Sequence, residues 1–290
     1  MLEAINLSRN IGKKTILEDC SLRLEPGKFM AVVGPNGAGK TTLLKIIAGE
    51  TRQYKGKVDL EGKPLSEYKA RELSKLRAIL SQYTLVSFPF TVEQVIEIGR
   101  YAHRSTSVEN SAIISEAMEL TQTTAFKGRT YQTLSGGEMQ RVQLARVIAQ
   151  LRDGTPASKY LLLDEPTSSL DLAQQQGLLS LAKTLCHQHF AVMAILHDLN
   201  LAAQYADEIL FLKNGKTMAY GPVKQVLTQD VIERTFEHPV TLLENDGQMV
   251  IMPKVIEHRT SKTRKNSEVR SQEMEAGRKL PLQVPGFRQS

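Results

Sequence analysis

The stretch Phe29–Gly49, FMAVVGPNGAGKTTLLKIIAG, joins an apolar strand pattern to a helix pattern through a glycine-rich loop. Glycines let a loop turn its backbone N–H groups toward a phosphate, and the following helix start favours an anion. The phosphate-loop spacing is complete, and the expected nucleotide-binding residues are Gly34, Pro35, Asn36, Gly37, Ala38, Gly39, Lys40, Thr41 and Thr42. We expect Lys40 to contact the β- and γ-phosphates of ATP and the Thr41 hydroxyl to bind Mg²⁺. The stretch therefore predicts an α/β nucleotide-binding domain.

Similar apolar runs recur along the chain, bounded by Gly, Pro or Lys and separated by helix-like stretches. This alternation is typical of a mostly parallel sheet covered by helices. Between about residues 84 and 150 the apolar residues recur at three- and four-residue spacing instead, which predicts an inserted α-helical subdomain. The predicted strands are Leu2–Leu7, Phe29–Val33, Ala78–Leu80, Tyr160–Leu163, Ala191–Leu196 and Glu208–Leu212.

Polar side chains follow three of these strands. In YLLLDEP, residues 160–166, the apolar strand is followed by two acids. Asp164 is the expected Mg²⁺ partner, and Glu165 can polarise a water beside the γ-phosphate. An acidic turn at a strand end is common, so this interpretation depends on the phosphate loop. His197 is either a polar cap of its strand or a hydrogen-bond donor to the γ-phosphate or the attacking water. Gln82, after RAILSQ, can bind Mg²⁺ or its water, but alone it carries little signal.

LSGGEMQ, residues 134–140, is a second anion-binding signature in a chain with one phosphate loop. Ser135, Gly136 and Gly137 precede a helix pattern, which is the composition of a helix start that can bind a phosphate. No second nucleotide-binding fold surrounds them in the sequence. The residues alone do not explain why a chain with one phosphate loop carries a second anion-binding signature.

Bulk composition excludes several classes of protein. No apolar run approaches the roughly 18 residues of a membrane span, and the N-terminus lacks a signal-peptide pattern, which favours the cytoplasm. Nine Lys or Arg against four Glu in residues 254–290 account for five of the six net positive charges, so the basicity does not indicate nucleic-acid binding. We interpret these residues as a largely disordered tail, solvated or in weak contact with acidic lipid or a partner. Cys20 and Cys186 suggest a reducing compartment, and Cys186-His187-Gln188-His189 matches no standard zinc spacing.

Together the phosphate loop, Gln82, LSGGEMQ, YLLLDEP, SSLD and His197 resemble the ATP-binding cassette ATPases over about residues 1–222. LSGGEMQ is the signature of that family. The resemblance implies a phosphate-loop NTPase of this type, with an antiparallel β subdomain beside the mostly parallel core. It also implies a head-to-tail homodimer in which Ser135, Gly136 and Gly137 of one subunit close over the γ-phosphate of the other.

The same resemblance implies a role for each remaining site residue. Glu165 would be the general base, Asp164 the magnesium acid and His197 the switch histidine. Gln82 would be the lever at the contact with transmembrane subunits, and Asp171, in SSLD, would lie in the loop that links the two sites. One departure concerns adenine, because Ile11 stands where the family has an aromatic residue. We therefore expect apolar packing on the base, with ATP as the nucleotide and GTP use as a measurable alternative.

Longer matching stretches, including FPFTVEQVIEIGR and ILHDLNLAAQYADEILFLKNGK, look like the haem importer branch of that family. This predicts an energy-coupling ATPase peripheral to the cytoplasmic face of the inner membrane, bound to permease subunits and indirectly served by a substrate-binding protein. The expected organisation is an ATPase domain over 1–253, with a family-specific segment at about 223–253, and the tail over 254–290. Siderophore or vitamin B12 import, or a soluble iron–sulfur assembly ATPase, are the alternatives. VSFPF, residues 86–90, either docks a permease coupling helix or packs internally.

Overall fold

The computed structural model describes residues 1–81, 86–152, 157–168, 170–245 and 247–255. Met1–Pro253 form one compact unit. The sequence predictions for Gln82 and for residues 256–290 of the tail lie outside the described residues. None of the helices in the described ranges is both long and apolar enough to cross a membrane.

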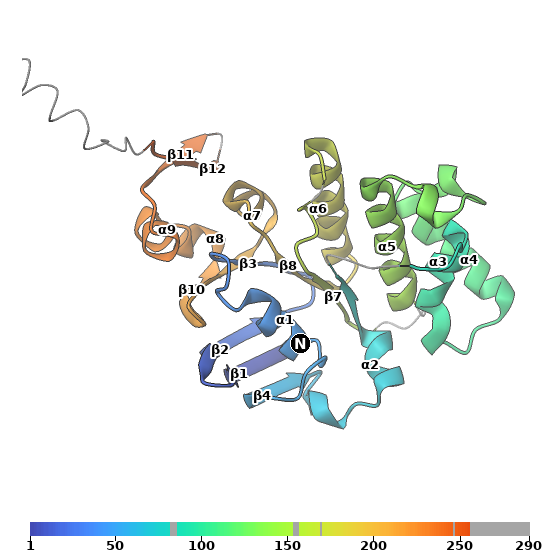
Figure 1. The fold of residues 1–290 in the computed structure, drawn as a ribbon, viewed down its shortest axis with the longest axis horizontal. Helices are drawn as coiled ribbons and strands as arrows, with labels where there is room; N and C mark the ends of the chain where they lie inside the picture. The colour runs from blue at the N-terminus through green and yellow to red at the C-terminus, as the bar shows by residue number, and fades with distance from the viewer. Residues whose placement is uncertain (82–85, 153–156, 169, 246, 256–290) are drawn as a thin grey trace, which may run out of the picture. The chain divides into compact units, whose positions relative to one another are not determined.

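A six-stranded sheet forms the centre of this unit (Figure 1). Its strands are parallel except the edge strand β10, which runs antiparallel to β9. In spatial order they are β10 (Lys216–Pro222), β9 (Glu208–Lys213), β3 (Phe29–Val33), β8 (Phe190–Ile195), β7 (Lys159–Leu163) and β6 (Arg77–Leu80). The predicted parallel core is confirmed.

Both faces of this sheet are covered, which explains the uninterrupted apolar runs in its strands. Successive side chains of a strand point to opposite faces. In β3, Met30 and Val32 join one apolar cluster while Phe29, Ala31 and Val33 join the other. All five side chains are almost completely buried. The sheet is therefore the middle layer of the domain.

An antiparallel sheet covers one face, together with α1 (Lys40–Ile47) (Figure 1). Its strands, in spatial order, are β2 (Lys14–Leu24), β1 (Leu2–Ile11), β4 (Lys55–Leu60) and β5 (Lys63–Pro64). This confirms the expected antiparallel subdomain. Of these strands the sequence analysis identified only the first part of β1, because their outward side chains are polar and interrupt the apolar pattern.

Helices cover the other face of the central sheet. The predicted helical insert consists of α3 (Val92–Glu97), η2 (Ile98–Ala102), α4 (Ser107–Leu120), η3 (Thr124–Phe126), η4 (Tyr131–Thr133) and α5 (Gly136–Leu151). The other helices after this insert are α6 (Leu172–Cys186), α7 (Leu199–Tyr205), α8 (Val223–Val226) and α9 (Gln229–Phe236), whereas η1 (Leu65–Glu67) and α2 (Ala70–Leu76) pack with the antiparallel sheet through Leu65 and Leu73. A hairpin of β11 (Val240–Asn245) and β12 (Gln248–Pro253) ends the unit. The side-chain amide of Asn200 exchanges two hydrogen bonds with the backbone of Ile251, which joins α7 to this hairpin.

Gly99 allows η2 to lie directly against α5. A Cβ atom at this position would stand 2.3 Å from the carbonyl oxygen of Arg146. We expect Gly99→Ala to lower the free energy of unfolding by about 1–3 kcal/mol, because two backbones would have to separate. Urea denaturation followed by circular dichroism measures this change.

Gly177 provides the matched control. It lies in α6, and a Cβ atom added there meets nothing within 4 Å. Gly177→Ala should therefore leave stability unchanged or raise it by about 0.5–1 kcal/mol, since Ala favours a helix. Equal effects of the two substitutions would contradict the close contact at Gly99.

Candidate active site

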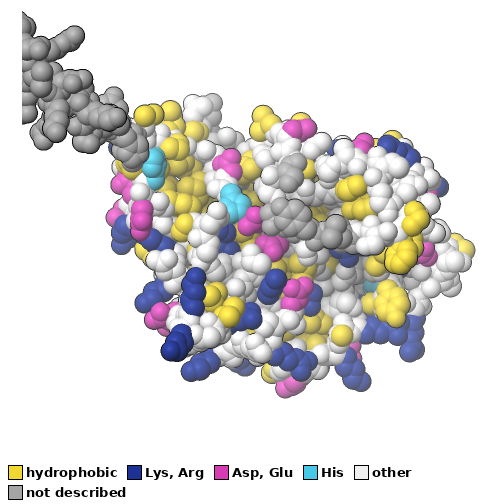
Figure 2. All heavy atoms as spheres, viewed as in Figure 1, with side chains coloured by type: hydrophobic (Ala, Val, Ile, Leu, Met, Phe, Trp, Pro, Cys, Tyr) yellow, Lys and Arg dark blue, Asp and Glu magenta, His cyan; other side chains and the backbone are white. Residues whose placement is uncertain are grey.

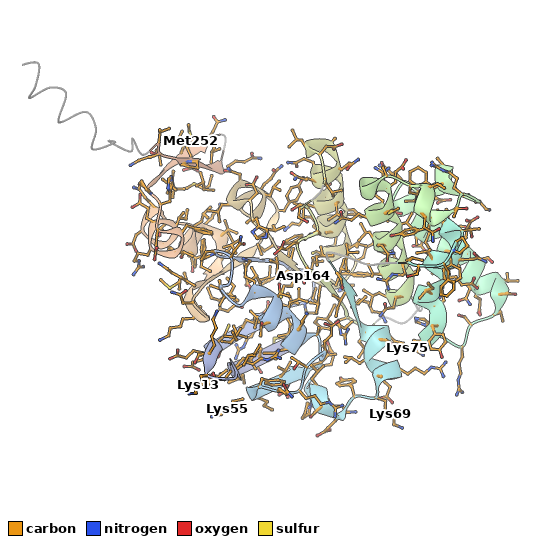
Figure 3. All side chains as sticks on the ribbon, in the orientation of Figure 1. Lys13, Lys55, Lys69, Lys75, Asp164 and Met252 are labelled. Atoms are coloured by element: carbon orange, nitrogen blue, oxygen red, sulfur yellow. The ribbon has the colours of Figure 1, made fainter. Side chains whose placement is uncertain are left out.

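The strand order brings the phosphate loop, the pair Asp164 and Glu165, and His197 to one edge of the sheet. β3 pairs with β8, β8 pairs with β7 and β7 pairs with β6, all in parallel. The segments that leave the carboxyl ends of these strands therefore start side by side, which is where open α/β sheets bind ligands. The phosphate loop follows β3, His197 follows β8, and Asp164 and Glu165 follow β7. Figure 3 shows Asp164 near the middle of the molecule in that view, with Lys13, Lys55, Lys69 and Lys75 at the margin.

The phosphate loop has a backbone that only glycine fits at two positions. A Cβ atom at Gly34 would lie 2.0 Å from the carbonyl oxygen of Leu212, and one at Gly39 would lie 2.7 Å from that of Ile16. Gly39 also has a φ of +101°, a conformation that other residues rarely adopt. These contacts hold the loop tightly between β9 and β2.

Lys40 lies within this loop. Its ammonium group donates hydrogen bonds to the carbonyl oxygens of Gly34, at 2.7 Å, and Pro35, at 3.1 Å. Only 5% of the residue is exposed. Burial lowers the pKa of Lys40, while the nearby carboxylates of Glu165 and Asp164 oppose this shift. A buried cation held by the carbonyls of a glycine-rich loop at a helix start is suited to a bound polyphosphate.

Thr41 and Asp164 bring two oxygen ligands together. The Thr41 hydroxyl donates to Asp164 Oδ1 at 3.3 Å. Burial raises the pKa of Asp164, with a further contribution from Glu165, and the hydrogen bond from Thr41 opposes the rise. A hydroxyl beside a carboxylate is the donor set that Mg²⁺ prefers when phosphates complete its shell. In the described part of the chain no cluster of three His, Cys, Asp or Glu side chains forms a metal site by itself.

Glu165 and His197 meet across the neighbouring strand ends. His197 Nε2 lies 2.9 Å from Glu165 Oε1. Figure 2 shows a histidine side chain beside acidic side chains near the middle of the face in view. Glu165 has a φ of +51° although it is not glycine. Such strain collects at functional positions, where the surrounding structure must maintain it.

Ser135, Gly136 and Gly137 lie at the start of α5, away from the phosphate loop of their own chain. The Ser135 hydroxyl accepts from the N–H of Glu138, and Glu138 Oε2 accepts from the N–H of Ser135 at 2.7 Å. Ser135 makes no hydrogen bond with the phosphate loop of residues 34–41, all of which the structure describes. Ser135 and Gly136 are exposed, so they can face a second molecule.

Ile11 and Asp171 have clear positions in the fold. Ile11 ends β1, is 56% exposed and pairs with Lys14 in the hairpin whose Ile16 packs on Gly39. An apolar surface is therefore available beside the phosphate loop. Asp171 begins α6, and its Oδ1 accepts a hydrogen bond from the Gln174 N–H at 2.8 Å. Gln82 lies outside the described residues.

The sequence analysis missed two glutamines next to Glu165. The Gln140 side-chain amide donates to the carbonyl oxygen of Pro166. The Gln175 amide donates to the carbonyl oxygens of Thr167 and Leu170, both at 3.1 Å. Gln140 belongs to LSGGEMQ, but a contact over 26 residues leaves no periodic signal that could have identified its partner.

A family model described as ABC transporter matches residues 17–168, from β2 to the turn after Glu165. The chain belongs to the ABC transporter family. This confirms the resemblance found in the sequence. The matched range includes the phosphate loop, LSGGEMQ and the pair Asp164 and Glu165, so the chain is an ATP-binding cassette ATPase of that family.

Curated ABC relatives match most of the chain. The hemin import ATP-binding protein HmuV of Escherichia coli O157:H7 is 42% identical over 246 residues, covering 84% of this chain and 95% of that protein. The protein of the same name from Gloeobacter violaceus is 47% identical over 240 residues, covering 81% and 87%.

Solved ABC structures share the fold. A metal-chelate type ABC transporter in an inward-facing conformation has a TM-score of 0.73 at 26% identity, covering 88% of this chain and 97% of that chain. A dimeric bacterial ABC transporter cassette has a TM-score of 0.66 at 25% identity, covering 77% and 99%. Cassettes of this family therefore occur both as dimers and within transporters.

Proposed function

We propose that this chain is the ATP-hydrolysing, energy-coupling subunit of a hemin (haem) importer. The observation that carries the proposal is its 42–47% identity, over more than four fifths of its length, to proteins named for hemin import. As part of such an importer the chain lies at the cytoplasmic face of the inner membrane, bound to permease subunits. A substrate-binding protein delivers the cargo to the permease, so the ATPase itself does not bind hemin.

The site geometry supports a mechanism for ATP hydrolysis. Lys40 and the loop N–H groups would hold the β- and γ-phosphates, and Thr41 and Asp164, together with Gln82 by the family resemblance, would hold Mg²⁺ directly or through water. The ion would supply positive charge against the charge that develops on the phosphate oxygens. Glu165 accepts a proton from the water that attacks the γ-phosphorus, and the bond to the β–γ bridging oxygen breaks to yield ADP and phosphate. His197, whose Nε2 lies 2.9 Å from Glu165 Oε1, orients that carboxylate.

Two copies of the chain complete each site. At the start of α5 the exposed Ser135 and Gly136 offer a hydroxyl and backbone N–H groups at a helix N-terminus, the part of a helix that binds anions, while Gly137 is buried beside the Gln174 side chain. Because these groups do not bond to the loop of their own chain, we assign Ser135, Gly136 and Gly137 to the γ-phosphate on a second copy. Asp171, at the start of α6, then lies in the loop that links the two sites. Ile11 packs on the adenine ring.

A groove between β6 and the helical subdomain supports docking of a permease helix. Its volume is about 720 Å³, and its lining includes Phe88, Phe90, Ile98, Arg77 and Arg146. Phe88 is 69% exposed, whereas Phe90 packs against the core. The stretch 86–90 thus combines internal packing with an exposed aromatic anchor.

Phe88→Asp should separate the ATPase from its permease. An aromatic anchor in an interface contributes about 2 kcal/mol or more, so we expect at least a 30-fold weaker association with the solubilised permease. ATP binding by the isolated chain should not change, because Phe88 is outside the phosphate loop. Co-purification and surface binding measurements check both results.

Val108→Asp is the matched control for Phe88→Asp. Val108 is 78% exposed on α4 and is not part of the groove lining. This variant should associate normally with the permease. Equal loss of association in the two variants, or none in either, would contradict docking at the groove.

Affinity purification from gently solubilised membranes tests the function as a whole. We expect a polytopic membrane protein to co-purify, and hemin-loaded binding protein to stimulate ATP hydrolysis by the complex in liposomes. Stimulation by a siderophore or cobalamin, and not by hemin, would overturn the assignment of hemin as the cargo. A soluble scaffold partner in place of a membrane protein would support an iron–sulfur assembly ATPase instead.

A further inference from the structure

Glu165 occupies a turn that its own sequence does not favour. Its φ of +51° lies in the left-handed region, which a residue with a Cβ atom adopts at a cost of about 1–3 kcal/mol. Pro166 follows it, and a proline restricts the residue before it mainly to extended conformations. The carboxylate nevertheless reaches His197. Contacts beyond the turn must therefore maintain this conformation.

Two kinds of hydrogen bond hold the turn. Within it, the N–H and the hydroxyl of Ser168 donate to the carbonyl oxygen of Glu165 at 3.3 and 3.1 Å. From outside, the Gln140 amide donates to the carbonyl oxygen of Pro166, and the Gln175 amide holds Thr167 and Leu170. Pro166 and Thr167 are buried, so unmade hydrogen bonds at their carbonyls would be costly.

Gln140 differs from Gln175 in the helix that carries it. Gln175 belongs to α6, whereas Gln140 belongs to α5, whose first turn holds Ser135. Five residues along an α-helix span only about 7.5 Å. α5 is packed into the core through Val142, Leu144 and Ala145. A shift of the α5 N-terminus is thus carried to Pro166 as movement of one rigid element.

We propose that Gln140 is a positioning residue that couples the two ATP sites of the dimer. Its helix presents Ser135 to the nucleotide of the second copy, while its amide holds the Glu165 turn that serves the nucleotide of its own chain. Closure of one site therefore sets the position of the general base in the other. The inference rests on the shared sites of the proposed function, and it predicts that hydrolysis is cooperative through this hydrogen bond.

Gln140→Glu removes the donor while keeping the size of the side chain, and it places a carboxylate against the Pro166 carbonyl. We expect kcat of the full chain to fall about 10- to 100-fold, as a displaced catalytic group implies, with little change in ATP binding. The Hill coefficient for ATP, which can reach two for two coupled sites, should fall toward one. Gln140→Lys restores a donor and should recover much of both kcat and cooperativity.

Gln175→Glu is a comparison variant. It removes two hydrogen bonds from Thr167 and Leu170, in and beside the loop assigned to link the two sites, so both kcat and the Hill coefficient should fall there as well. If Gln140→Glu keeps the wild-type kcat and Hill coefficient, or if Gln140→Lys recovers neither, the coupling role is wrong. Ser135→Arg, assayed in parallel, shows which of the two proposals fails. Full turnover in that variant overturns the shared ATP site of the proposed function. Loss of turnover there, with normal cooperativity in Gln140→Glu, overturns only the coupling.

Discussion

Glu165→Gln is expected to lower ATP turnover by about 10²- to 10⁴-fold, the range that a positioned general base contributes. The amide has nearly the same shape as the carboxylate but accepts a proton far less readily. It can still hydrogen-bond His197, whose Nε2 lies 2.9 Å from Oε1 in the wild type. ATP binding should remain within about twofold, because Lys40 and the loop N–H groups, not Glu165, contact the phosphates in the proposed mechanism.

Steady-state phosphate release and equilibrium binding of a fluorescent ATP analogue separate these two effects. Glu109→Gln is the matched control, since Glu109 caps α4 far along the chain from the site and its loss should leave turnover unchanged. Turnover within about threefold of the wild type in Glu165→Gln would remove Glu165 from the role of general base.

Ser135→Arg is expected to abolish turnover, to below about 1% of the wild type, while the isolated chain still binds ATP. The exposed Ser135 hydroxyl and the adjacent N–H groups would meet the γ-phosphate on the second copy. A long charged side chain there prevents the two chains from closing. The loss of the Ser135 cap on α5 also costs about 0.5–2 kcal/mol in stability, so the capping effect must be separated from the effect on the dimer.

Thr106→Arg provides that separation. Thr106 caps α4 with the same arrangement, in which its hydroxyl accepts from the N–H of Glu109 and Glu109 accepts from the N–H of Thr106. This control should lose similar stability but keep its turnover and its ATP-dependent dimer in gel filtration. Full turnover in Ser135→Arg, or equal loss in Thr106→Arg, would contradict the shared site.

The predicted core strands agree with the observed ones to within a few residues, and this success has a physical origin. β3, β7, β8 and β9 are buried on both faces, so nearly every residue in them must be apolar. The antiparallel strands β2 and β4 escaped prediction because their outward residues are free to be charged. In KTILEDCSLRL the core positions are Leu17, Cys20, Leu22 and Leu24, whose spacing a register shift interrupts.

By itself the sequence determined the chemistry of this protein, because phosphate binding depends on short-range spacing. Gly34–Thr41 and the pair Asp164 and Glu165 are local patterns, and LSGGEMQ marks the family. Only the tertiary structure decided where these motifs lie relative to one another and which of them are in contact. The order β3, β8, β7 brings three distant strand ends to one edge, and an amide from α5 bonds to the strained turn of Glu165. Such contacts between distant segments form only when the chain packs, so no local pattern encodes them.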